Sequence, residues 1–135
     1  MTLKVKVISP DQVVVDDEAE EVILPSTTGQ LGILTDHVPL LTALDIGVMR
    51  LRKDKSWQSI ALMGGFAEIE ENELTILVNG AQTSSDIDAD AARNELVAAE
   101  ERLSKVDSSN KQEKLQAEQA LRRARARVQA VTANS

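Results

Sequence analysis

Short segments in which apolar and polar residues alternate run through the first two thirds of the chain. Clear examples are Leu3–Val7, Trp57–Met63 and Leu74–Val78. A period of two puts the apolar side chains on one face of a β-strand, so each segment predicts a half-buried strand. Turn-forming residues separate these segments, for example at Lys53–Lys55 and Glu71–Asn72. Many short strands with turns at near-regular spacing predict a two-layer antiparallel sheet.

A helical pattern replaces the alternation near residue 86. Every glycine and proline lies at or before Gly80. Beyond it, apolar residues recur at steps of three and four, which predicts two amphipathic helices. Their apolar stripes are Ala92, Leu96, Ala99, Leu103 and Val106, then Ala117, Leu121, Ala124, Val128 and Val131. Asp88 is placed to cap the first helix, and Ser109 or Asn110 to cap the second. Two similar stripes joined by a short polar loop predict an antiparallel helical hairpin.

The chain is therefore predicted to be an α+β protein, with an antiparallel β-sandwich over residues 1–86 and a two-helix hairpin over residues 87–135. The hairpin stripes hold few large apolar side chains, each of which contributes about 1.5–3 kcal/mol when buried. Ordering the backbone costs about 1–2 kcal/mol per residue. We therefore expect the hairpin to dock on the sandwich or on a partner, and to be able to move between two such places.

Composition narrows the classes of function. The chain has 135 residues, of which 42% are hydrophobic and only Trp57 and Phe66 are aromatic, so it can bury one modest aliphatic core. Cysteine is absent, which favours a reducing compartment. No apolar run approaches the roughly 20 residues of a membrane span, so we expect no membrane insertion. The net charge of -7 argues against nucleic acid as a partner.

The charge is unevenly distributed. Residues 1–86 carry 6 basic and 14 acidic side chains, whereas residues 87–135 carry 9 and 8. Four of the basic side chains lie close together in the second helix, at Arg122, Arg123, Arg125 and Arg127. Cations near a helix C-terminus complement the helix dipole and keep the helix soluble, which is the plainer interpretation. However, four arginines within six positions cover more than one helix face, which favours docking onto an acidic surface.

The stretch from Gly29 to Gly47 contains three of the six glycines and the only histidine, His37. We expect its glycines to relieve positive-φ strain at bends, and residues 35–38 to form an exposed corner before Pro39. A phosphate-binding Walker loop is not favoured, because no Gly-Lys-Ser/Thr ending follows. The pair Gly64-Gly65 lies between two strand-like runs, which predicts a β-bulge or a close backbone approach.

Four motifs keep a specific order and spacing along the chain: Gly29–Leu34, His37–Leu41, Gly47 and Gly64–Ile69. Together they resemble the epsilon subunit of F-type, proton-translocating ATP synthases. The tail from Ala120 to Val128 is most similar to the photosynthetic branch, which includes cyanobacteria and chloroplasts. The resemblance implies a β-sandwich followed by two helices, located on the central rotor stalk where it meets the membrane-embedded ring.

The resemblance also implies a non-catalytic subunit that couples proton flow to ATP synthesis. Its implied partners are the gamma stalk subunit, the membrane ring of c subunits and the alpha/beta catalytic head. The complex would be peripheral to the thylakoid or plasma membrane, on the cytoplasmic or stromal-type face. In this family the tail can extend into the catalytic head and inhibit ATP hydrolysis, a contact that we assign to Arg122, Arg123, Arg125 and Arg127. Stalk and ring contacts are carried over to Gln30, Asp36 and His37.

Some members of this family bind ATP on the folded hairpin, through an Ile/Leu-Asp-x-x-Arg-Ala motif and arginines of the second helix. The matching residues here are Ile87, Asp88, Arg123 and Arg127. Ala91 stands where the motif has arginine, so one charge-assisted phosphate contact is missing. We therefore predict weak or absent ATP binding and no cofactor. An ATP-sensing module remains the alternative function.

A lone histidine beside an aspartate, His37 after Asp36, would fit the catalytic base of a small hydrolase. No Ser or Cys nucleophile in a recognisable setting accompanies it, so corner packing or an interface role is the preferred interpretation. A typical zinc site needs a further His or Cys, which the chain lacks, and we predict no metal site. The remaining acidic cluster fits a solvated strand face and is assigned no chemistry; its members are Glu68, Glu70, Glu71 and Glu73.

Overall fold

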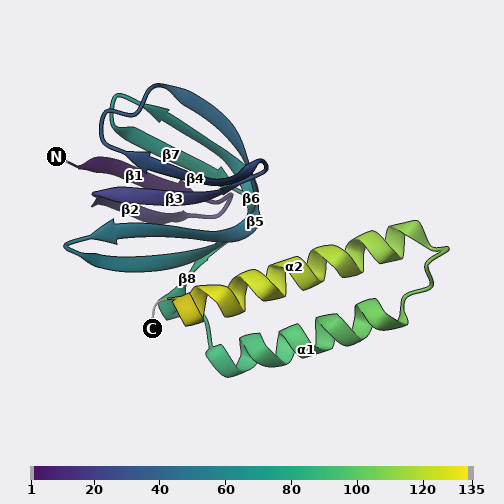
Figure 1. Ribbon diagram of the computed structural model, residues 1–135. Helices are drawn as coiled ribbons and strands as arrows, with labels where there is room; N and C mark the ends of the chain where they lie inside the picture. Colours follow the sequence, from purple (N-terminus) through teal and green to yellow (C-terminus); the bar gives the residue numbers. More distant parts are fainter. Residues whose placement is uncertain (1, 134–135) are drawn as a thin grey trace.

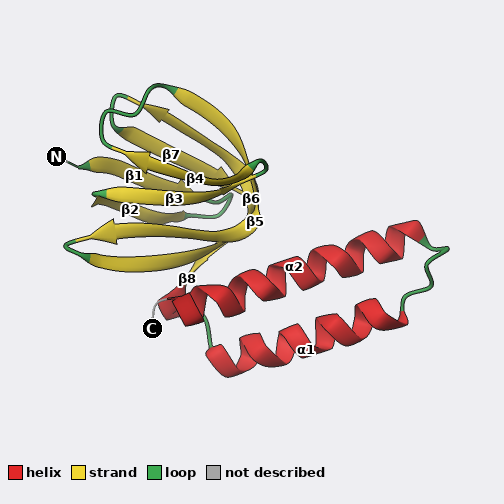
Figure 2. Cartoon of the chain, viewed as in Figure 1, coloured by secondary structure: helices red, strands yellow, loops and turns green. Residues whose placement is uncertain are grey.

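The computed structural model describes residues 2–133 of the chain. Its strands come first and its helices last, and the two kinds of structure form separate parts of the molecule (Figures 1 and 2). The strands of this range are β1 (Leu3–Ile8), β2 (Val13–Ala19), β3 (Glu21–Ser26), β4 (Gly29–Leu34), β5 (Leu40–Lys53), β6 (Ser56–Glu70), β7 (Glu73–Val78) and β8 (Ala81–Thr83). The helices are the 3-10 helix η1 (Ser84–Asp86), α1 (Ala89–Lys105) and α2 (Lys111–Ala133).

The strands form one hydrogen-bonded sheet that folds over into two layers. Its order is β2-β1-β7-β6-β5-β3-β4, and β8 also pairs with β6. The long strands β5 and β6 take part in both layers. The C-terminal half of β6 pairs with β7, whereas residues 60–62 in its N-terminal half pair with β8. The β-sandwich predicted from the alternating pattern is therefore confirmed.

One pairing departs from the predicted antiparallel arrangement. Strands β1 and β7 run parallel, with Val5 opposite Leu74 and Val7 opposite Ile76, while the other pairs of the described sheet are antiparallel. The reason is topological. Strands that follow each other through a tight turn must run antiparallel, whereas β1 and β7 are distant in the sequence and are free to run parallel. A period of two identifies a strand and its buried face, but it does not give the direction of the neighbouring strand.

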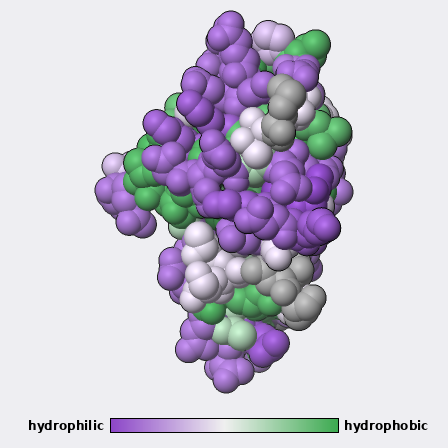
Figure 3. Space-filling model, turned by 90° about the vertical axis from the view of Figure 1, so that its left-hand side faces the viewer, coloured by the Kyte–Doolittle hydropathy of each residue, from purple (hydrophilic) through white to green (hydrophobic). Residues whose placement is uncertain are grey.

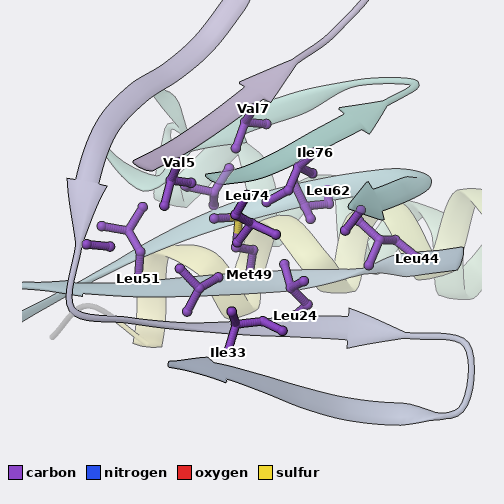
Figure 4. Close-up of a cluster of buried hydrophobic side chains, with 14 of the residues drawn as sticks. Val5, Val7, Leu24, Ile33, Leu44, Met49, Leu51, Leu62, Leu74 and Ile76 are labelled. Carbon is purple, nitrogen blue, oxygen red and sulfur yellow. The ribbon is translucent and has the colours of Figure 1, made fainter. Parts of the chain in front are cut away.

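Large aliphatic side chains from both layers fill the space between them (Figure 4). The largest fully buried side chains are Leu3, Leu24, Ile33, Met49, Leu51, Ile60, Leu62, Ile69, Leu74, Ile76, Val5 and Val7. The two aromatic residues lie outside this cluster. Phe66 is exposed on the surface, and the Trp57 ring is covered by the guanidinium of Arg50, 4.8 Å from the ring centroid.

The bend of β5 and β6 requires its two glycines. Regular pairing is interrupted between Leu44–Gly65 and Ile46–Met63, where Gly64 has a φ of 82°. A Cβ at Gly65 would lie 2.0 Å from the carbonyl oxygen of Leu77, so only glycine allows β7 to approach this closely. Of the two predicted alternatives, the close backbone approach is confirmed. The register of β5 against β6 is the same on both sides of the glycine pair, so no β-bulge forms there.

The other glycine predictions are confirmed only in part. Gly29 has a φ of 122°, as expected at a turn. Gly32 and Gly47 lie within strands and do not adopt positive φ, so that expectation was wrong for both. Gly47 is required for a different reason, because a Cβ there would lie 2.8 Å from Cβ of Pro25 on the neighbouring strand. The predicted exposed corner does form between β4 and β5.

Side-chain caps begin both α-helices. Oδ1 of Asp88 accepts hydrogen bonds from the amides of Asp90 and Ala91, at 3.0 and 3.1 Å, which confirms the predicted cap of α1. For α2 the cap is Asn110, whose Oδ1 accepts from the amide of Glu113 at 3.1 Å. The Glu113 carboxylate bonds the Asn110 side-chain amide at 3.2 Å, so the reciprocal bond of a capping box goes to the side chain instead of the backbone.

Candidate functional site

The helical hairpin, whose tail carries the predicted arginine contact, is docked on the sandwich. Helix α2 lies between α1 and the strands β5 and β6 (Figure 1). It achieves this by burying two different faces. The face toward α1 forms a cluster of Ala99, Leu121 and Ala124, with Leu96 and Leu103 at its edge. The face toward the sheet forms a cluster of Ala61, Ala126 and Ala130, bordered by Ile46, Val48, Met63 and Ile87. The predicted stripe corresponds to the first face, and the second was not predicted.

Arg122 ties α2 to the sandwich through an ion pair with Asp45 of β5. Asp45 lies at the bend of β5, beside the glycine pair of β6. The two side chains remain 45% and 43% exposed, so water and salt screen their attraction. Exposed pairs of this kind contribute about 0.2–1 kcal/mol. The contact therefore orients the helix without fixing it strongly.

Arg127 connects three elements near the start of α1. Its Nε donates to Oε1 of Gln82 on β8 at 2.7 Å, and its Nη1 donates to Oε1 of Glu95 on α1 at 2.6 Å. Its side chain is 24% exposed, which makes it better shielded than Arg122. Arg122 and Arg127 are called the engaged arginines below, because the folded chain already uses both.

The other two predicted arginines have no such role in the folded hairpin. Within residues 2–133, neither Arg123 nor Arg125 forms an ion pair or a hydrogen bond through its guanidinium. Arg125 is exposed, whereas Arg123 is half-buried at the rim of a cavity of about 1050 Å³ between α2 and the sandwich. We call Arg123 and Arg125 the free arginines. The structure thus divides the cluster into two pairs with different surroundings.

The residues that match the ATP motif do not form one phosphate-binding group. The carboxylate of Asp88 caps α1, and the side chain of Ile87 borders the alanine cluster on the sheet. Arg127 is bonded to Gln82 and Glu95, and only Arg123 is left without a polar partner among the described residues. Ala91 is exposed at the position where the motif has arginine.

The corner residues Asp36 and His37 turn toward different partners. The amide of Asp36 donates to Oδ1 of Asn72 at 2.6 Å, and Asn72 Nδ2 donates back to Oδ1 of Asp36 at 3.4 Å. Nδ1 of His37 donates to the carbonyl oxygen of Val38 at 2.6 Å. The aspartate and the histidine are therefore not assembled as a catalytic pair. Gln30 is exposed near the start of β4, whereas the corner follows the end of that strand. The length of the strand, about 17 Å, therefore lies between Gln30 and the corner.

An exposed row of apolar residues crosses five strands on the outer face of the sandwich. Strand pairing places Ala43, Phe66, Leu77, Ile8 and Val13 side by side, in that order. Phe66, Leu77 and Val13 are 58%, 53% and 56% exposed. A contiguous exposed patch of this kind usually marks an interaction surface. We call it the apolar row; it was not predicted, because its members come from five separate segments of the sequence.

The face shown in Figure 3 is mainly hydrophilic, with hydrophobic residues gathered in separate patches. Among the described residues, no group of three or more histidine, aspartate or glutamate side chains is placed to hold a metal ion. Over the same residues, neither helix has both the length and the apolar character of a membrane span.

Comparison with known proteins gives matches along nearly the whole chain. A family model described as the beta-sandwich domain of the ATP synthase delta/epsilon chain matches residues 2–84. A second, described as the long alpha-helix domain of the same chain, matches residues 85–132. Similar curated proteins include the chloroplastic ATP synthase epsilon chain of Pyropia yezoensis, 62% identical over 98% of both chains. The epsilon chain of Thermosynechococcus vestitus is 60% identical over 96% of this chain and 95% of its own.

Solved structures share the fold at low sequence identity. A chain from the mitochondrial ATP synthase of Euglena gracilis has a TM-score of 0.79 and 17% identity, over 93% of this chain and 78% of that one. A chain from the central stalk and c-ring of the Tetrahymena thermophila mitochondrial enzyme has a TM-score of 0.58 and 15% identity, over 100% and 98%. At these identities the likeness concerns the fold alone.

Proposed function

The chain belongs to the epsilon-chain family of ATP synthases, and we propose that it is a rotor subunit whose sandwich attaches to the central stalk and whose hairpin restrains ATP hydrolysis. The family match over both parts of the chain supports this proposal. The subunit itself would be non-catalytic and would help to couple proton flow to ATP synthesis. It would act in a complex peripheral to the thylakoid or plasma membrane, on the cytoplasmic or stromal-type face.

The observation that carries the inhibitory part of the proposal is the weak docking of α2. Its sheet-facing side buries only alanines, and one of its two polar ties is an exposed ion pair. Alanine contributes little on burial, and the larger side chains around it are only partly buried, so release of the helix would cost less than opening the sandwich core. Once released, all four arginines become available to an acidic surface, such as that expected on the alpha/beta catalytic head. On this proposal the hairpin alternates between the docked position and one on the catalytic head, as a switch requires.

The attachment part of the proposal rests on two surfaces of the sandwich. The apolar row offers a contiguous exposed patch to the gamma stalk subunit. The corner, with the exposed Asp36 and the half-buried His37, would face the stalk or the ring of c subunits, as would the exposed Gln30 near the start of β4. These surfaces lie on the sandwich, so attachment does not require the hairpin to be docked.

The decisive experiment compares the two pairs of arginines. In a synthase reconstituted with the full chain, we expect Arg123→Ala/Arg125→Ala to weaken inhibition of hydrolysis while the folded hairpin keeps its amide protection. The matched variant Arg122→Ala/Arg127→Ala should weaken inhibition and also loosen the docked hairpin. Undiminished inhibition after replacement of all four arginines would refute the proposed contact.

A truncation separates the two roles. We expect a chain ending at Asp86 to assemble into the complex and to support proton-coupled ATP synthesis, while inhibition of hydrolysis falls. Loss of assembly after this truncation would contradict attachment through the sandwich alone.

An ATP-sensing hairpin is the second candidate function. Ala91 and the engaged state of Arg127 both count against it, because a triphosphate would find few free cations. We expect isothermal titration calorimetry of the isolated chain with ATP to give weak or no binding. Micromolar affinity would favour the sensor.

A further inference from the structure

Asn72 holds three segments of the sandwich together. It forms the tight turn between β6 and β7 with Glu71, and both residues have left-handed backbones, with φ of 64° and 49°. The carbonyl oxygen of Asn72 accepts from the amide of Lys4 at 2.8 Å, which joins the turn to β1. Its side chain makes the two bonds to Asp36 described above. Of the hydrogen bonds that Asn72 makes, only these two side-chain bonds reach the corner at residues 35–38.

The corner depends on this contact because it has little other support. Residues 35–39 belong to no helix or strand, and Asp36 has a left-handed φ of 63°. Its amide finds its acceptor in the side chain of Asn72. The corner projects its next residues outward, and Val38 is 70% exposed. The imidazole of His37 is held on the corner's own backbone.

We propose that Asn72 is a positioning residue, whose side chain fixes Asp36 so that His37 and Val38 meet the rotor partner in one orientation. This inference rests on the proposed attachment of the corner to the stalk. Its physical basis is preorganisation, since a loop that is already ordered loses less conformational entropy on binding. Asparagine suits the position twice, because it tolerates the left-handed turn and presents both a donor and an acceptor.

The chain provides a matched control for the turn itself. The β5–β6 turn has the same backbone geometry, with φ of 52° at Asp54 and 68° at Lys55. Lys55 occupies the position equivalent to Asn72. Within the described residues, its side chain forms no hydrogen bond or ion pair with residues 35–38. The variant Lys55→Gly therefore tests the effect of a glycine in a turn. Asn72→Gly has that effect and also removes the two side-chain hydrogen bonds to Asp36, which are called the clasp below.

The experiment titrates the full chain into catalytic head and stalk complex depleted of its own epsilon chain, and measures the dissociation constant. In parallel, hydrogen exchange is measured at the Asp36 amide. We expect Asn72→Gly to weaken binding by about tenfold. Lys55→Gly should change it by less than about twofold. Asn72→Asp should also weaken binding, because it opposes the carboxylate of Asp36.

The exchanged pair Asp36→Asn/Asn72→Asp restores one acceptor and one donor across the contact, so it should recover wild-type affinity and protection at residue 36. Tight binding by Asn72→Gly together with a rapidly exchanging Asp36 amide would overturn the positioning role. An Asp36 amide that stays protected in Asn72→Gly would overturn the clasp. A wild-type chain that does not bind the depleted complex would instead refute the proposed function, and the inference with it.

Discussion

The sandwich and the hairpin bury different kinds of side chain. The sandwich core is built from leucine, isoleucine, valine and methionine contributed by both layers. The fully buried residues where α2 meets the sheet are three alanines, and where it meets α1 they are two alanines and one leucine; the larger apolar side chains at both contacts are only partly buried. A buried large aliphatic side chain contributes about 1.5–3 kcal/mol, and an alanine methyl less than about 1 kcal/mol.

This difference in packing predicts that the sandwich is the more rigid part of the chain and that the hairpin is the part more easily released. The core must stay folded for the outer surfaces to keep their shape. The helical contacts need only be strong enough to hold α2 when nothing else binds it. The polar ties follow the same division, since Arg122 and Asp45 meet at the surface where salt screens them.

A core truncation should have the largest effect. Leu62 is fully buried, so Leu62→Ala should lower the free energy of unfolding by about 2–5 kcal/mol. Urea denaturation followed by circular dichroism measures this. The control is Leu115→Ala on α2, where the side chain is 54% exposed and the effect should be small. Similar losses for the two variants would show that the parts are not as different as their packing indicates.

Enlarging an alanine of the helical contact should affect the hairpin selectively. Ala126→Leu adds bulk where α2 meets Ala61, at a cost of about 1–3 kcal/mol. We expect α2 to lose amide protection while the sandwich amides keep theirs. Gln129→Leu places the same side chain at an exposed position of the helix and serves as the control. Equal loss of protection in the sandwich would mean that the two parts unfold together.

Removing the charge of Asp45 should have a smaller effect. Asp45→Asn weakens the tie to Arg122 by about 0.2–1 kcal/mol and should raise amide exchange of α2 only modestly. High salt should abolish the difference from the wild-type chain, because it screens the same contact. Asp54→Asn removes an acidic charge from the β5–β6 turn and should leave α2 unchanged. A difference that persists in high salt would contradict an ionic origin.

The smallest expected effect concerns pH. Nζ of Lys53 lies 2.7 Å from Oδ1 of Asp17, and this hydrogen bond lowers the pKa of Asp17. A lowered carboxyl pKa stabilises the fold at pH values above the ordinary value, and the stabilisation is lost as the pH falls through the lowered pKa. Asp17→Asn should therefore lower Tm at pH 7 by no more than about 4 °C, because the pair is exposed.

The measurement compares Tm of Asp17→Asn and wild type from neutral pH down to about pH 2, below the ordinary aspartate pKa. The two curves should converge at the acidic end. Asp11→Asn, at an exposed loop position, should match the wild type throughout. A gap that widened toward acid would contradict the assigned sign.

Much of the fold could be predicted because its signals are local. Alternation marks each strand, and the cap at Asp88 and the stripe through Leu121 mark the hairpin. The second buried face of α2 gave no comparable signal. Alanine is a strong helix former on buried and exposed faces alike. Ala126 and Ala130 therefore do not reveal which side of the helix meets another surface.

The parts of the site that were missed depend on contacts between distant segments. The arginines are evident in the sequence, but their partners Asp45, Gln82 and Glu95 resemble ordinary surface residues. The apolar row exists only once five strands are in register, and one of its pairings is the parallel one between β1 and β7. A list of exposed alternating positions could have suggested Phe66 and Leu77, but not that they are neighbours.

The sharing of β5 and β6 between the two layers has a mechanical consequence. In a sandwich whose layers are joined only by side-chain packing, a twisting force could slide one layer over the other. Here two continuous strands pass through the bend at Gly64 and Gly65, so covalent chain connects the layers. We therefore expect a twisting force on one outer surface to reach the other through the backbone and the hydrogen-bonded strands, so that the two layers move together.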